Sequence, residues 1–218
     1  MRLTIKVIPF SLSLTFLIFL SGFSQEDTIS HILNRLGEET RKLETGSFNF
    51  EQKILIKSTL EEKLVTGSIK FRAPDKLYAE YVQPYRQVII CNGKKVWFYL
   101  PEYNQVSIES VDRLEDLMGL NLSLFFWANR IEELEDYEKE LVEGTEEYYK
   151  IRLVPKKENG QEIVLVVSKK FWLPIETEVS DSYILVSTSL GDVVKNPELD
   201  NEIFEFEVPA EAQVFESP

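Results

Sequence analysis

The chain has 218 residues, a formal net charge of -13, one His and one Cys. Such an acidic chain is poorly suited to nucleic acid or to anionic lipid surfaces, because both are bound through Lys and Arg. A single Cys excludes an internal disulfide, and one His with one Cys cannot make a zinc site alone, so we expect neither a metal site nor a cofactor.

Residues 1–24 have the composition of an export signal. Arg2 and Lys6 precede an apolar run over 10–20, and small residues follow over 21–24. The run is shorter than the roughly 20 apolar residues that a membrane-spanning helix needs. We therefore predict a signal peptide over 1–24 and a single domain over 25–218, exported and soluble; an uncleaved anchor helix is the alternative.

The next segment, 28–43, predicts an amphipathic helix. Its apolar residues recur at helical spacing while the other face is charged; they are Ile29, Ile32, Leu33, Leu36 and Leu43. A helix of this kind must lie on an apolar surface.

Strands are predicted after the helix. Six apolar or alternating stretches follow, over 47–56, 64–72, 78–81, 88–91, 95–100 and 105–109. Asn92-Gly93 between two of them is a strong short-range hairpin signal.

The strand pattern stops between 111 and 136 and then resumes. Val111, Leu114, Leu117 and Met118 have helical spacing, and a dense apolar cluster follows over 120–127, which predicts one or two helices. Further strands are predicted over 138–142, 148–154, 163–168, 175–179, 183–188 and 203–208.

The number of strands favours a curved sheet. A single sheet of more than about ten strands curls or splits. The stretches over 96–100 and 163–167 are apolar on both faces, and two helical stretches are too few to cover both faces of a flat sheet. We expect a curled sheet with an apolar concave side; a closed β-sandwich with an aromatic core is the alternative.

Several short motifs occur in a fixed order along the chain. They are Phe50-Glu51-Gln52, Gly67 and Pro74, the aromatic stretch 77–84, Asn92-Gly93, Val96 to Tyr99 with Pro101 and Gln105-Val106, the cluster 122–127, the stretch 149–155, Leu173-Pro174, and 204–209. This order and spacing resembles the periplasmic outer-membrane lipoprotein carrier family, LolA. The resemblance spans most of residues 25–218.

The resemblance implies a mainly β (α+β) fold: an incomplete antiparallel β-barrel of about 11 strands. Its concave apolar face would be closed by the N-terminal amphipathic helix and a central lid helix. It implies a periplasmic chaperone, not an enzyme, that binds the acyl chains of lipoproteins and delivers them to the outer membrane. The implied partners are acylated lipoproteins as cargo, an inner-membrane lipoprotein-releasing ABC transporter and an outer-membrane acceptor; we expect a monomer.

The predicted acyl-chain-binding residues share an apolar character and a place on the sheet or on a covering helix. On the sheet they are Phe50, Ile54, Ile69, Phe71, Leu77, Ala79, Tyr81, Val88, Ile90, Val96 and Phe98; on the helices they are Ile32, Leu36, Leu122, Phe125 and Phe126. Ordinary core packing is the alternative for each. No catalytic residue is predicted.

One position departs from the family pattern. The family often has Arg immediately before the Pro, where it helps to hold the lid shut; here Ala73 occupies that place and Arg72 comes one residue earlier. Because neighbouring side chains of a strand point to opposite faces, Arg72 would point away from the place that the family's Arg occupies. Arg72 is the candidate lid latch, with an ordinary solvated Arg as the alternative.

A second function fits the same sequence. A periplasmic lipid-binding or lipid-sensing module on this fold would carry free lipid or glycolipid, or report envelope stress, and would need the same apolar face.

Overall fold

The computed structural model describes residues 25–111, 131–158 and 160–216. Within these residues it has one α-helix, α1 (Gln25–Arg41), and the short 3-10 helices η1 (Pro101–Tyr103), η3 (Ile131–Asp136) and η4 (Asn201–Phe204). The strands are β1 (Thr45–Ile56), β2 (Glu61–Arg72), β3 (Lys76–Gln83), β4 (Gln87–Asn92), β5 (Lys95–Leu100), β6 (Gln105–Ser110), β7 (Tyr137–Gly144), β8 (Tyr148–Pro155), β9 (Glu162–Ser168), β10 (Pro174–Ser180), β11 (Ile184–Lys195) and β12 (Gln213–Glu216).

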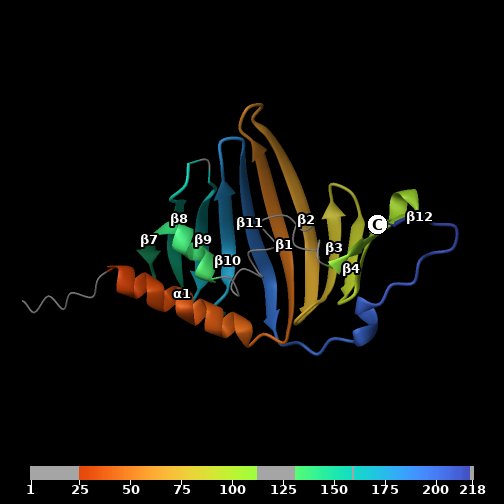
Figure 1. Ribbon diagram of the computed structural model, residues 1–218, viewed down its shortest axis with the longest axis horizontal. Helices are drawn as coiled ribbons and strands as arrows, with labels where there is room; N and C mark the ends of the chain where they lie inside the picture. Colours follow the sequence, from red (N-terminus) through yellow and green to blue (C-terminus); the bar gives the residue numbers. More distant parts are fainter. Residues whose placement is uncertain (1–24, 112–130, 159, 217–218) are drawn as a thin grey trace, which may run out of the picture.

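All of these strands belong to one twelve-stranded sheet in the order β12-β6-β5-β4-β3-β2-β1-β11-β10-β9-β8-β7. Figure 1 shows this order, with the β1–β2 hairpin rising above its neighbours. The neighbouring strands are antiparallel except β12, which runs parallel to β6. The predicted mainly β fold is confirmed, with a parallel edge strand that the sequence did not predict.

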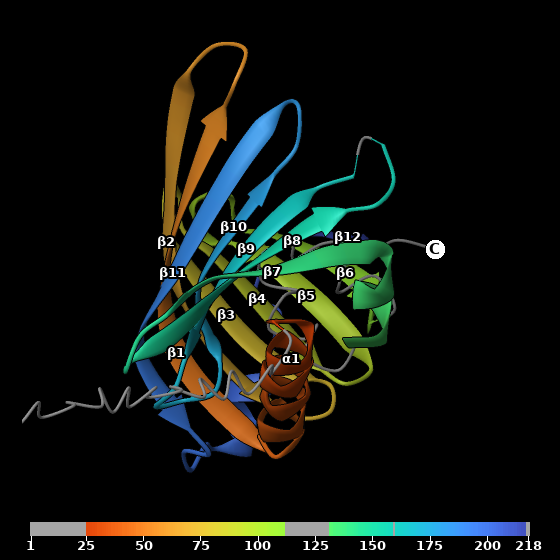
Figure 2. The ribbon, with the colours of Figure 1, turned by 90° about the vertical axis from the view of Figure 1, so that its left-hand side faces the viewer.

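The sheet is strongly curved and open. β12 and β7 form its two edges and do not pair with each other, and Figure 2 shows the strands curling around α1. Because the chain forms one curled sheet and not two facing sheets, the alternative of a closed sandwich is wrong. The predicted signal peptide (1–24) and the lid residues Leu122, Phe125 and Phe126 lie outside the described residues.

The amphipathic helix forms where its spacing predicts it. Ile29, Ile32, Leu33 and Leu36 are each at most 5% exposed and pack with apolar residues of β8, β9 and β10. The helix ends at Arg41, two residues earlier than predicted. None of the helices that the structure describes is long and apolar enough to cross a membrane.

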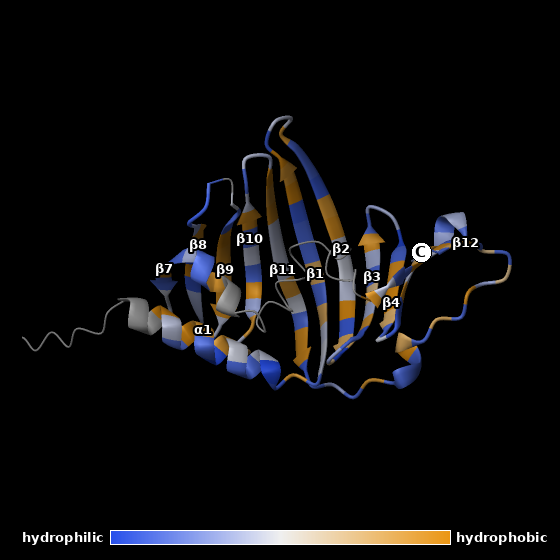
Figure 3. Cartoon of the chain, viewed as in Figure 1, coloured by the Kyte–Doolittle hydropathy of each residue, from blue (hydrophilic) through white to orange (hydrophobic). Residues whose placement is uncertain are grey.

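The alternation of side chains sets the two faces of the sheet. Figure 3 shows hydrophobic and hydrophilic residues alternating along several strands, as expected when successive side chains point to opposite faces. We call the face that carries α1 the concave face, and the opposite one the outer face.

The strand predicted over 203–208 is wrong. Residues Asn201–Phe204 form η4, and the chain then continues without pairing in the sheet until β12. Phe204 is completely buried, and η4 packs against β3 and β4. Phe206 contacts Trp97 and Tyr99 of β5, with ring centroids 6.2 and 5.5 Å apart. The alternating pattern therefore reflects an extended segment that covers the outer face; we call residues 197–212 the outer segment.

Candidate functional site

Cross-strand register defines the apolar surface on the concave face. Residues directly opposite each other on neighbouring strands share a face. One row runs from Phe48 through Ile69, Ala79 and Ile89 to Phe98, and so crosses the sheet from β1 to β5. A second row, beside the first, joins Phe71, Leu77, Cys91 and Val96 across β2 to β5. These rows form one continuous apolar cluster.

Most of the predicted binding residues lie in this surface. Phe50, Ile69, Phe71, Leu77, Ala79 and Val96 belong to the buried cluster, and Tyr81 and Phe98 are half-buried against it. Ile54 lies on the same face of β1, opposite Val186 of β11, and is also half-buried. Ile32 and Leu36 lie in the separate cluster between α1 and β8–β10. These residues of the predicted set therefore lie in two regions of one concave side.

Two predicted residues, Val88 and Ile90, lie on the outer face. Val88 pairs with Tyr99 and Ile90 with Trp97, and the outer segment packs over these rings through Phe206. Both are buried. Strand β4 is apolar on both faces because each face is covered. Hydrophobicity alone therefore did not show which residues of β4 lie on the concave face.

The sequence prediction missed three members of the two cross-strand rows: Phe48, Ile89 and Cys91. The turn between β4 and β5 contains an even number of residues, which pairs Cys91 with Val96. A hairpin with an even turn always places an odd-numbered residue opposite an even-numbered one. Val96 lies on the concave face, so Cys91, which stands opposite it, lies there too. Ile89, two residues earlier on β4, shares that face.

Two glycines leave room for aromatic rings on the concave face. Phe50 and Tyr81 flank Gly67 in one cross-strand row, and their rings meet edge to face with centroids 5.3 Å apart. A Cβ at Gly67 would lie 2.8 Å from the Phe50 ring and would also collide with the carbonyl oxygen of Glu80. At Gly46 a Cβ would collide with the ring of Phe71. Glycine is required at both places because the rings occupy the space of a side chain.

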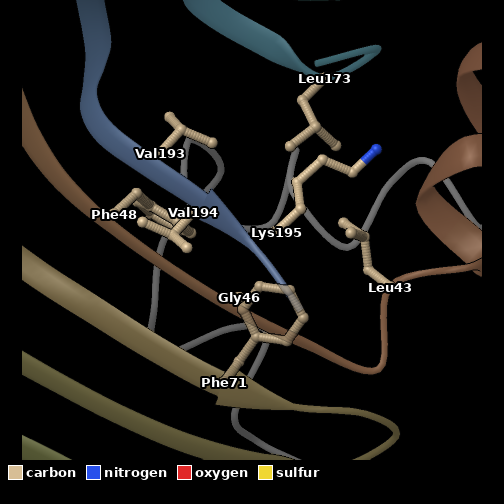
Figure 4. A pocket seen from close by; sticks show the side chains of 8 residues that line it. All are labelled: Leu43, Gly46, Phe48, Phe71, Leu173, Val193, Val194 and Lys195. Carbon is tan, nitrogen blue, oxygen red and sulfur yellow. The ribbon is translucent and has the colours of Figure 1, made fainter. Parts of the chain in front are cut away.

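The lower end of the concave face closes against the segment after α1. Leu43, Phe71, Leu173 and the backbone of Gly46 line a narrow gap with no room for a water molecule, and Figure 4 shows these side chains around it. Lys195 reaches across this end: its Nζ donates to the carbonyl oxygen of Phe171 at 2.9 Å and lies 3.7 Å from a carboxylate oxygen of Glu39 on α1. The helix is therefore tied to the sheet by charge as well as by apolar contact.

The candidate lid latch, Arg72, does not reach the concave face. Its neighbour Phe71 is on that face, so Arg72 points to the outer face. There its Nη2 donates to the carbonyl oxygen of Leu199 at 2.6 Å. Arg72 therefore holds the outer segment, and its role as a lid latch stays a prediction.

The concave face is not wholly apolar. Gln52, Thr188 and Thr177 stand opposite one another on β1, β11 and β10. Gln52 donates to the Thr188 hydroxyl at 3.2 Å, whereas the buried Thr177 hydroxyl has no hydrogen-bond partner in the part of the chain that the structure describes. Burial also raises the pKa of the Tyr81 phenol to about 12, so this side chain keeps its proton, and remains a hydrogen-bond donor, further into alkaline pH than an exposed tyrosine.

The groups that could support catalysis are scattered. His31 is exposed on α1. Cys91 is completely buried, its Sγ lies 3.1 Å from the carbonyl oxygen of Asp75, and burial raises the pKa of its thiol; a thiolate nucleophile is thereby disfavoured. Within residues 25–111, 131–158 and 160–216, no three His, Cys, Asp or Glu side chains come together as a metal site.

The open, curled sheet and its apolar concave surface define a class of incomplete β-barrel proteins. Within that class, the chain belongs to the outer membrane lipoprotein carrier protein family, LolA, whose model matches residues 41–207.

Known proteins similar to the chain agree with it in sequence and in fold. An outer-membrane lipoprotein carrier protein of Nitrosomonas europaea is 30% identical over 167 residues, which cover 76% of this chain and 79% of the relative. One from Idiomarina loihiensis is 28% identical over 215 residues, which cover 96% and 98%. A crystal structure of an uncharacterized conserved protein from Thermus thermophilus matches with a TM-score of 0.55 at 13% identity, over 87% of this chain and 99% of that one. At that identity the likeness concerns the fold alone.

Proposed function

We propose that the protein is a periplasmic carrier that binds the acyl chains of lipoproteins released from the inner membrane and delivers them to the outer membrane. One observation carries the proposal: the apolar surface that runs without interruption from β1 to β5 on the concave side of an open sheet. Family membership supports it. In this proposal residues 1–24 are the export signal and residues 25–218 act as one carrier domain.

The physical task of such a carrier is desolvation. Each methylene that leaves water is worth about 0.8 kcal/mol, so a lipoprotein with several acyl chains does not cross an aqueous compartment unaided. The half-buried Tyr81 and Phe98 provide apolar area without hydrogen bonds of strict geometry. Such a surface would accept acyl chains from many lipoproteins.

The charge of the chain supports transport through water. The net charge of -13 repels anionic membrane surfaces and keeps the protein dispersed. A carrier that must leave the donor membrane with its cargo benefits from this repulsion. Loading and release would then depend on an inner-membrane ABC transporter and an outer-membrane acceptor, the partners that the proposal requires.

The test is the identity of the molecule that the protein carries. The full chain is expressed with export, purified from the envelope without detergent, and analysed by native mass spectrometry. We expect bound acylated lipoprotein, and depletion of the protein should leave lipoproteins at the inner membrane. Free lipid alone, with lipoproteins correctly sorted after depletion, would instead support the lipid-carrier or sensor function; absence of any lipid would contradict both.

A further inference from the structure

The polar row on the concave face is built from three adjacent strands. Gln52 of β1 stands opposite Thr188 of β11, which stands opposite Thr177 of β10. Thr188 and Thr177 are 5% and 7% exposed. Strands in a sheet are about 4.8 Å apart, so the row extends for roughly 10 Å across the sheet.

Apolar rows lie on both sides of this polar row. Phe50 and Leu190 face each other in the row on one side. Ile54, Val186 and Val179 face one another in the row on the other side. The hydroxyls and the amide therefore form a narrow polar band within an apolar surface.

The hydrogen bonds of the band are incomplete. Gln52 Nε2 donates to Thr188 Oγ1 at 3.2 Å, which leaves the Thr188 hydrogen available as a donor. Thr177 Oγ1 is buried and has no partner among the described residues. A buried hydroxyl without a partner destabilises the folded protein. Its position on a surface suited to apolar ligands indicates that the missing partner is an atom of the ligand.

The chemistry of the band selects the ligand group. All three side chains are neutral, and hydroxyl and amide hydrogens require an acceptor. A free carboxylate or a phosphate would bury a charge here with no cation in the row, which is costly. A neutral carbonyl flanked by hydrocarbon meets both conditions.

From this geometry we propose that Gln52, Thr188 and Thr177 form a subsite for the ester carbonyl groups of a diacylglyceryl anchor, with the acyl chains on the side of Phe50 and Leu190, away from the row that packs with α1. The inference rests on the proposed function, because it places this group within the acyl-chain surface. It adds that the protein distinguishes an acyl ester from a hydrocarbon chain of the same length.

The test compares two probes that differ only at the linkage: dipalmitoylglycerol, with ester carbonyls, and its dihexadecyl ether analogue, without them. Each probe displaces an environment-sensitive fluorophore from the protein. We expect the ester to bind about fivefold more tightly, the value of one net hydrogen bond. Palmitate, which tests a free carboxylate, should bind less well than the ester.

Two isosteric variants test the assignment. Thr177→Val and Thr188→Val should each bring the ester-to-ether ratio close to one. Thr66→Val, on the outer face of β2, is the matched control and should keep the wild-type ratio. Thr177→Val removes a hydroxyl that has no hydrogen-bond partner among the described residues, so we expect this variant to fold normally.

The outcomes separate the two proposals. If the wild type binds ester and ether equally, or if both valine variants keep the preference, the ester subsite is overturned and the carrier function stands. If the wild type binds neither probe, the carrier function fails.

Discussion

Arg72 on β2 donates a hydrogen bond to the backbone carbonyl of Leu199, at 2.6 Å. This contact joins the end of a central strand to the beginning of the outer segment. Further along that segment, Phe204 and Phe206 cover the outer side of β3 to β5. Arg72 thus supports the outer covering of the sheet, while the ligand surface lies on the other face.

Replacing this arginine should loosen the outer segment selectively. We expect Arg72→Ala to lower the free energy of unfolding by about 1.5–3 kcal/mol, the range for a hydrogen bond from a charged group. Amide hydrogen exchange and limited proteolysis should increase over 197–216. Lys70→Ala, two residues earlier on the same face, serves as the control. Unchanged exchange over 197–216 in Arg72→Ala would show that the segment is held by its aromatic contacts alone.

The glycine beneath the Phe50–Tyr81 pair should not tolerate a side chain. A Cβ at Gly67 meets both a ring and a backbone carbonyl, so Gly67→Ala should destabilise the protein by about 1–3 kcal/mol through overpacking. At Gly191 nothing lies within 4 Å of the corresponding Cβ, and Gly191→Ala should change little. Urea unfolding of both variants measures the difference; equal stability would mean that the ring can move aside.

Stability should fall at alkaline pH through Tyr81. Burial raises the pKa of its phenol from 10.0 to about 12. Between these values the unfolded chain releases the proton while the folded chain keeps it, so the contribution is complete below pH 10 and is lost as the pH rises toward 12. The loss amounts to at most about 3 kcal/mol. Tyr81→Phe should flatten this part of the urea-unfolding profile, and a profile that keeps its wild-type slope would argue against a buried phenol.

The unpartnered hydroxyl of Thr177 should reduce stability in the absence of ligand. Thr177→Val keeps the shape of the side chain and removes a buried hydroxyl that makes no hydrogen bond within residues 25–111, 131–158 and 160–216. We expect the free energy of unfolding to rise by about 1 kcal/mol or more. Chemical denaturation of the ligand-free protein measures it, with Thr66→Val for comparison. A loss of stability would mean that the hydroxyl is already satisfied in the folded protein.

Much of the sheet could be predicted because its information is local. Alternation and turn residues predict the β4–β5 hairpin around Asn92-Gly93, and helical spacing predicts α1. The face of β4 was mistaken because both faces of that strand are apolar. Only the even number of residues in the turn shows that Ile89 lies on the concave face and Val88 on the outer face.

The C-terminal region could not be predicted from local pattern. Phe204 and Phe206 alternate with acidic residues as in a strand, yet they lie on a sheet that other strands have completed. β12 pairs in parallel with β6, so that Val214 stands opposite Val106, a residue far earlier in the chain. A four-residue stretch carries no signal for such a distant partner. Likewise, the Thr177–Thr188–Gln52 row exists only through the register of β10, β11 and β1.

The central claim is that acyl chains bind on the concave face, and a pair of charge substitutions tests it most directly. Phe98→Glu places a carboxylate on that face, whereas Ser68→Glu places one on the outer face at a similarly half-buried position. Binding of a fluorescent triacylated lipopeptide is measured by anisotropy, with circular dichroism to verify folding. We predict a roughly tenfold or greater loss of affinity for Phe98→Glu, because a buried unpaired charge opposes hydrocarbon, and wild-type affinity for Ser68→Glu. Wild-type affinity in a folded Phe98→Glu variant would contradict the claim.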